Sequence, residues 1–124
     1  MRILAGLLAL VLGVNGLFML FGSLAWYGAV PGVTATGPFN PHFVRDIGAA
    51  YVTAAGGIAW FAWRPREGWP ALVAAAAFLT MHAAIHLFDA TCGPTPLKDT
   101  LRDLVAVHLT ALLTLILALR KRSL

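Results

Sequence analysis

Charged residues and cysteine are scarce in this chain. Of its 124 residues only 11% are charged, 60% are hydrophobic, and the mean hydropathy is +0.81. A soluble globular domain carries about 25% charged residues, so the composition argues against that class and indicates an integral membrane protein. Cys92 is the only cysteine, which excludes a disulfide framework within the chain.

No long run of basic residues accompanies the positive net charge. The formal charge is +4, but the Lys and Arg residues flank apolar stretches and form no contiguous arm. We therefore interpret them as topology signals and expect no nucleic-acid partner. The expected partners are the lipid bilayer and a small-molecule ligand. A homo-oligomer and a complex with a partner membrane subunit both stay open.

Four apolar stretches are long enough to cross a bilayer, for which a helix needs about 20 residues. Short links between the stretches predict antiparallel neighbours. The predicted fold class is therefore all-α, an integral membrane antiparallel four-helix bundle in which residues 1–124 form one domain. The predicted spans lie at about residues 3–27, 41–63, 69–89 and 96–119. The first span is expected to be retained, because its apolar stretch exceeds the roughly 7 to 15 residues of a cleaved signal.

Basic residues are divided unevenly between the two ends of the predicted bundle. With four spans, both termini share the end that holds more Lys and Arg, and this distribution predicts cytoplasmic N- and C-termini. On that side lie Arg2, Arg64, Arg66, Arg120, Lys121 and Arg122, and on the other lie Arg45, Lys98 and Arg102. Trp26 and Tyr27 are expected in the outer aromatic belt.

Proline marks the predicted helix ends. Asn40 before Pro41 predicts an N-cap and the first helical residue of the second span. Pro65 ends that span, because the residue before proline avoids the α conformation. Pro70 and Pro96 predict the starts of the third and fourth spans. Glycine and alanine are frequent in the first two spans, which predicts that these helices approach closely.

Most ionisable side chains gather towards the outer side. His82, His86 and Asp89 follow at spacings of four and three, so on an α-helix they form one strip. Charged groups within a membrane face the bundle interior or a wet cavity. We therefore expect a polar site that opens to the outer side. Its predicted members are His42, Arg45, Asp46, His82, His86, Asp89 and His108.

Three kinds of ligand suit these residues. Imidazoles with a carboxylate can hold a divalent transition metal, for which the predicted ligands are His82, His86, Asp89 and His108. The zincin motif HExxH is absent, because no Glu follows His82. Haem b between His82 and His108 and a quinone in an aromatic pocket are the alternatives. The predicted ligand-binding residues on the second span are His42, Arg45 and Asp46.

In the fourth span, either of two polar residues could point into the interior of the bundle. Asp103 and His108 are five residues apart, which separates their directions by about 140° on an α-helix. They cannot then both point into one site, and we predict that His108 is the inward residue.

The polar cluster also has a purely structural interpretation. Ion pairs such as Arg45 with Asp89, or Arg102 with Asp46, would hold helix ends together without any ligand. The predicted function is binding of a metal ion or small ligand, with redox chemistry as an option. The alternative is a non-enzymatic membrane subunit or accessory protein. No catalytic residue can be assigned, so enzymatic activity stays open.

A family resemblance rests on size, four spans, the prolines of the first outer loop and the RDIGAAY stretch at residues 45–51. In these features the chain resembles the small four-helix bacterial inner-membrane proteins of the DoxX-like kind and related families of unknown function. The resemblance implies a multi-pass protein of the bacterial inner membrane. Some members of that group are associated with thiol or thiosulfate oxidation feeding quinone. No catalytic motif carries over to residues of this chain.

Overall fold

The computed structural model describes residues 1–120, and this part of the chain is all-helical, without a strand. The predicted all-α class is confirmed. The elements are α1 (Arg2–Phe21), α2 (Ser23–Ala29), the 3-10 turn η1 (Val33–Thr36), α3 (Pro41–Trp63), α4 (Pro65–Cys92), α5 (Pro96–Asp103), the π-helix η2 (Leu104–Leu109) and α6 (Thr110–Leu119).

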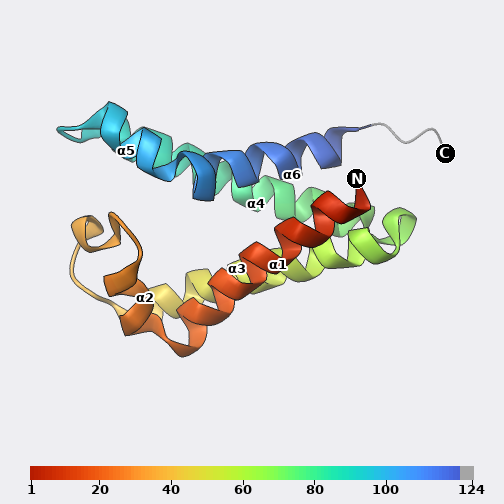
Figure 1. Cartoon of the computed structure of the whole chain (residues 1–124), viewed down its shortest axis with the longest axis horizontal. Coiled ribbons are helices and arrows are strands. Elements are labelled where there is room, and N and C mark those ends of the chain that lie inside the picture. Colours follow the sequence, from red (N-terminus) through yellow and green to blue (C-terminus); the bar gives the residue numbers. More distant parts are fainter. Residues whose placement is uncertain (121–124) are drawn as a thin grey trace.

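The long helices run back and forth along one axis (Figure 1). Helix α1 makes its most extensive contact with α3, α3 packs on α4, and α4 packs on α6, whereas α1 and α6 barely touch. The N-terminus and the end of α6 lie at one end of the molecule, which we call the proximal end. The α2–α3 connection and the α4–α5 turn lie at the other, the distal end.

Within residues 1–120, three segments are long and apolar enough to cross a membrane: α1, α4 and the continuous stretch Pro96–Leu119. Large apolar side chains face outwards, and Ile3 and Phe21 are 80% and 86% exposed, as suits contact with lipid. These features indicate a multi-pass membrane protein. Helix α3 is long enough, with 23 residues, but is not among the three segments. Arg45, Asp46 and the glycines of α3 lower its hydropathy.

The helix ends follow the proline pattern with one exception. The side chain of Asn40 accepts a hydrogen bond from the Phe43 backbone N–H at 3.1 Å, so α3 begins at Pro41 as predicted. The prediction that the third helix begins at Pro70 is wrong, because α4 begins at Pro65 and continues through Pro70. Pro65 occupies the first helical position, where a missing N–H has no intrahelical acceptor to lose.

The first apolar stretch is two helices. It was expected to continue to residue 27, but α1 ends at Phe21 and Gly22 separates it from α2. The indole N–H of Trp26 donates to Oδ1 of Asn15 at 2.9 Å. In a straight helix these residues would be about 16 Å apart along the axis, so α2 turns back towards α1. Trp26 is therefore partly buried against α1 and does not point freely into an aromatic belt.

Glycine brings α1 and α3 together, as the sequence predicts. A Cβ added at Gly16 would lie 2.8 Å from the carbonyl oxygen of Gly48, and one added at Gly48 would lie 2.9 Å from that of Gly16. The two backbones thus meet without an intervening side chain. Close backbone contact of this kind is how membrane helices gain packing energy where the hydrophobic effect is weak.

Candidate functional site

An ion pair joins α4 to the end of α5 near the distal end. Nδ1 of His86 lies 2.8 Å from Oδ2 of Asp103, and the two side chains are 32% and 11% exposed. A carboxylate only accepts hydrogen bonds, so Nδ1–H of His86 is the donor, and whenever the ring is neutral Nε2 is an acceptor. The carboxylate therefore fixes both the orientation and the tautomer of His86.

Arg102 is the second partner of this carboxylate. Its Nε donates to Oδ1 of Asp103 at 2.8 Å and its Nη2 to Oδ2 at 3.1 Å. Its Nη1 donates to Asp99 at 2.8 Å, and Asp99 accepts from Oγ1 of Thr95 at 3.0 Å. The nearly buried Asp103 is thus fully hydrogen-bonded, as a carboxylate out of water must be. We call His86, Asp99, Arg102 and Asp103 the distal ion cluster.

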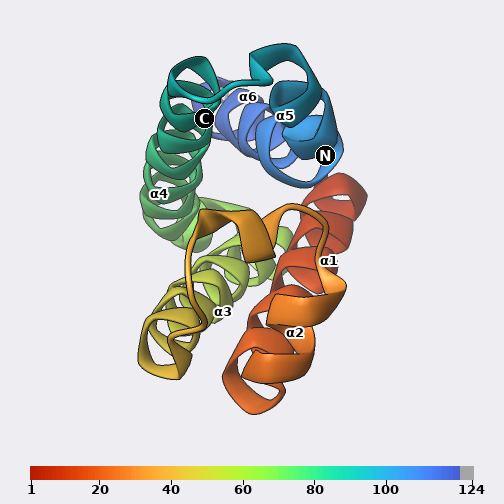
Figure 2. The same ribbon diagram turned by 90° about the vertical axis from the view of Figure 1, so that its left-hand side faces the viewer.

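The α2–α3 connection contacts the distal ion cluster at Gly32. Gly32 of this connection adopts a φ of 87°, in the left-handed region that favours glycine. A Cβ at Gly32 would lie 2.6 Å from Nη1 of Arg102, so any larger residue would require the guanidinium to move. Figure 2 shows the connection crossing the distal end between the helices. Arg102 of α5 therefore contacts this connection, and its partner Asp103 bonds to His86 of α4.

Aromatic rings continue from the cluster towards the interior. The ring of His82 lies one turn below His86, with 4.7 Å between ring centroids. It also contacts Tyr51 at 5.5 Å and stacks on Phe78 at 5.9 Å. Within residues 1–120, His82 has ring contacts but no hydrogen bond or ion pair. The site thus offers two adjacent imidazoles, one held by Asp103 and one unpaired, against an aromatic wall.

The π-helix η2 corrects the prediction for the fourth span. Asp103 is buried and bonded to His86, although His108 was predicted as the inward residue. Nε2 of His108 is also buried, and it has no hydrogen-bond partner in the described chain. Both residues turn inwards because Asp103 immediately precedes η2 and His108 lies within it. In a π-helix hydrogen bonds join residues five apart, so one turn closes over roughly that number and both side chains come to one face.

The predicted residues of the second span form a separate pair. Nε2 of His42 lies 3.2 Å from Oδ2 of Asp46, with side chains 86% and 63% exposed. Arg45 is exposed beside them, and within residues 1–120 no carboxylate pairs with it. An exposed pair of this kind contributes little to stability. The structure therefore divides the predicted polar site into this surface pair and the distal ion cluster.

The four predicted metal ligands are not assembled into a metal-binding group. In the described part of the chain no three His, Cys, Asp or Glu side chains are placed to hold one ion together. Asp89 is exposed, one turn beyond His86 on α4. The carboxylate that meets His86 comes instead from Asp103. The spacing of four and three residues therefore places His82, His86 and Asp89 on one strip of α4, but these side chains are not arranged to hold one metal ion together.

Tyr51 and Arg102 are among the site residues that reasoning from the sequence missed. Tyr51 faces His82 from α3, and Arg102 pairs with Asp99 and Asp103 on its own helix, not with Asp46 as suggested. The sequence did contain a signal for the pairing of Arg102 with Asp99, because these residues are three positions apart and share a helix face. For Tyr51 no local signal existed, since its partner lies on another helix.

The chain was compared with models of protein families, with curated proteins and with solved structures, and none of them matches it. No family is therefore identified, and the DoxX-like resemblance stays a prediction. What the sequence and structure establish is a small all-helical protein with three long apolar helices and a His86–Asp103 ion pair at its distal end.

Proposed function

We propose that the protein binds a small amphipathic ligand with a hydroxyl or carbonyl head group, of the quinol or quinone type, at His82 and His86. The observation that carries the proposal is the pair of adjacent imidazoles, 4.7 Å apart between ring centroids, with unused hydrogen-bonding capacity. Ligand sites in proteins combine an apolar wall with a few placed polar groups.

The chemistry of the two imidazoles suits such a head group. Asp103 holds His86 so that Nε2 can accept a hydrogen bond from a ligand hydroxyl. His82 carries one donor and one acceptor in its neutral ring. Tyr51 and Phe78 lie edge to face at 5.6 Å and form the apolar side of the site. A flat ring with polar substituents matches this combination of an aromatic wall and two ring nitrogens.

Binding of a short-chain quinone by the purified protein in nanodiscs tests this proposal. Replacing His82 by Leu removes one hydrogen-bonding ring and is expected to weaken binding about tenfold, equivalent to about 1.4 kcal/mol. His42→Leu is the matched control, because His42 is exposed and outside the site, and it should leave affinity unchanged. No saturable binding by the parent protein, or stoichiometric metal on elemental analysis, would contradict the proposal.

A second candidate is a purely structural role for the distal ion cluster in a non-enzymatic membrane subunit. The contact of Arg102 with Gly32 favours it, because one guanidinium then joins α5 to a connection far away in sequence. Under this alternative His86→Leu changes thermal stability while the parent protein binds no quinone. The two candidate functions therefore predict different results for quinone binding by the parent protein, before any substitution is made.

The proposed location is the bacterial inner membrane, with α3 as a fourth span and both termini in the cytoplasm. Cys92 is an exposed thiol at the distal end, and this topology places it outside. A membrane-impermeant maleimide should therefore label Cys92 in intact spheroplasts as fully as in permeabilised ones. Cys92→Ser is the control for background labelling. Labelling that requires permeabilisation would show the opposite orientation.

A further inference from the structure

An open apolar groove of about 650 Å³ runs between α1 and α3. Its floor consists of small residues from both helices, among them Gly6, Ala9, Ala55, Gly56 and Ala59. A Cβ at Gly6 or Gly56 would have no heavy atom within 4 Å, so the groove is unfilled at both positions. Its volume lies within the range of roughly 300 to 1,000 Å³ typical of small-molecule sites.

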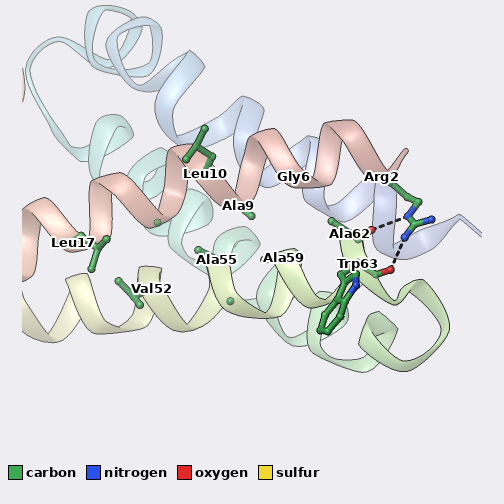
Figure 3. Close-up of a pocket in the computed structure, with 12 residues that line it drawn as sticks. Arg2, Gly6, Ala9, Leu10, Leu17, Val52, Ala55, Ala59, Ala62 and Trp63 are labelled. Atoms are coloured by element: carbon green, nitrogen blue, oxygen red, sulfur yellow. Dashed lines mark hydrogen bonds between the residues drawn. The ribbon is translucent and has the colours of Figure 1, made fainter.

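The groove ends at a guanidinium. Arg2 lies at its proximal end beside Trp63 (Figure 3). Nε of Arg2 donates to the carbonyl oxygen of Ala62 at 2.8 Å, and Nη2 donates to that of Trp63. These bonds fix the guanidinium against the last turn of α3. In residues 1–120 no carboxylate forms an ion pair with Arg2, so its charge is compensated only by helix carbonyls.

The length of the groove matches one leaflet of a bilayer. Its lining on α3 extends from Val52 to Trp63, which is about 16 Å along a helix axis. Half of a hydrocarbon core about 30 Å thick is about 15 Å. Trp63 at the proximal end is a residue type that membrane proteins place at the interface. The groove is therefore apolar along one leaflet and positive where that leaflet's head groups begin.

We propose that this groove binds one acyl chain of an anionic phospholipid, whose phosphate group is held by Arg2. A guanidinium is well suited to phosphate because its N–H groups form a rigid fork. A second copy of the chain fits the groove less well. In a dimer with its two-fold axis along the membrane normal, both copies would bring Arg2 to the same end of the interface, where like charges oppose association.

Native mass spectrometry of the purified chain with added phosphatidylglycerol or phosphatidylcholine tests the proposal. One arginine at a membrane surface contributes roughly 1 kcal/mol to binding an anionic lipid, so the parent protein should prefer phosphatidylglycerol about fivefold. Arg2→Gln should abolish this preference and Arg2→Lys should keep most of it. Arg66→Gln is the matched control at the same end, since Arg66 is exposed and off the groove.

A second variant separates the groove from the charge. Gly56→Leu should fill the groove and weaken binding of both lipids, whereas Gly28→Leu, at another open glycine on α2, should not. The proposal is overturned if the parent protein binds the two lipids equally, or if Arg66→Gln abolishes the preference as Arg2→Gln does. It is also overturned if the parent protein is a dimer that Gly56→Leu converts to monomers, since a second copy then fills the groove.

Discussion

Replacing Asp103 by Ala is expected to lower the free energy of unfolding by about 3 kcal/mol, at the lower end of the range for breaking a buried ion pair. The side chain is only 11% exposed and is bonded to both His86 and Arg102. Its loss leaves the Arg102 guanidinium without a counter-charge and Nδ1–H of His86 without an acceptor, next to the α2–α3 connection. Reversible unfolding in mixed detergent micelles, followed by circular dichroism, measures the change.

Asp89→Ala is the matched control for this substitution. Asp89 is an exposed carboxylate close to His86 along α4, and no ion pair involves it in the described residues. A surface change of this kind alters stability by roughly 0.5 kcal/mol or less. Equal losses for the two variants would show that Asp103 owes its effect to the general removal of negative charge and not to the distal ion cluster.

Helix boundaries could be predicted where one residue decides them. Asn40 and Pro41 define the start of α3 by an N-cap and a fixed φ, both of which are local properties of the chain. Gly22 and Pro70 show the limit of such reasoning. The sequence around Gly22 is apolar enough to continue a helix, but the chain turns there and Trp26 donates a hydrogen bond to Asn15 of α1. Pro70 lies inside a helix that Pro65 had already begun.

The candidate site shows the same division between local and distant effects. His82 and His86 could be placed on one strip, because their spacing and the helix period are both known. The identity of the carboxylate that meets them could not be derived, since it depends on how α5 packs on α4. The π-helix η2 adds to this difficulty. It changes the direction of every later residue on the span, and the 140° separation expected between Asp103 and His108 no longer applies.

The substitution Gly48→Ala is expected to destabilise the protein by about 2 kcal/mol. A Cβ there would lie 2.8 Å from Cβ of Met19 and 2.9 Å from the carbonyl oxygen of Gly16, so α1 and α3 must move apart. Overpacking of a core contributes about 3 kcal/mol at the upper end of its range. The better helix propensity of alanine offsets about 1 kcal/mol of this.

Gly56→Ala is the internal control, because it lies on the same helix two turns later and has open space around its Cβ. Only the helix-propensity gain applies there, so this variant should be more stable than the parent by up to about 1 kcal/mol. Gly48→Ala and Gly56→Ala are thus expected to change stability in opposite directions. A general effect of replacing glycine by alanine in α3 could not produce this result. If both variants are stabilised, α1 and α3 are not in backbone contact at Gly16 and Gly48, and the packing that positions Tyr51 against His82 is different from that described.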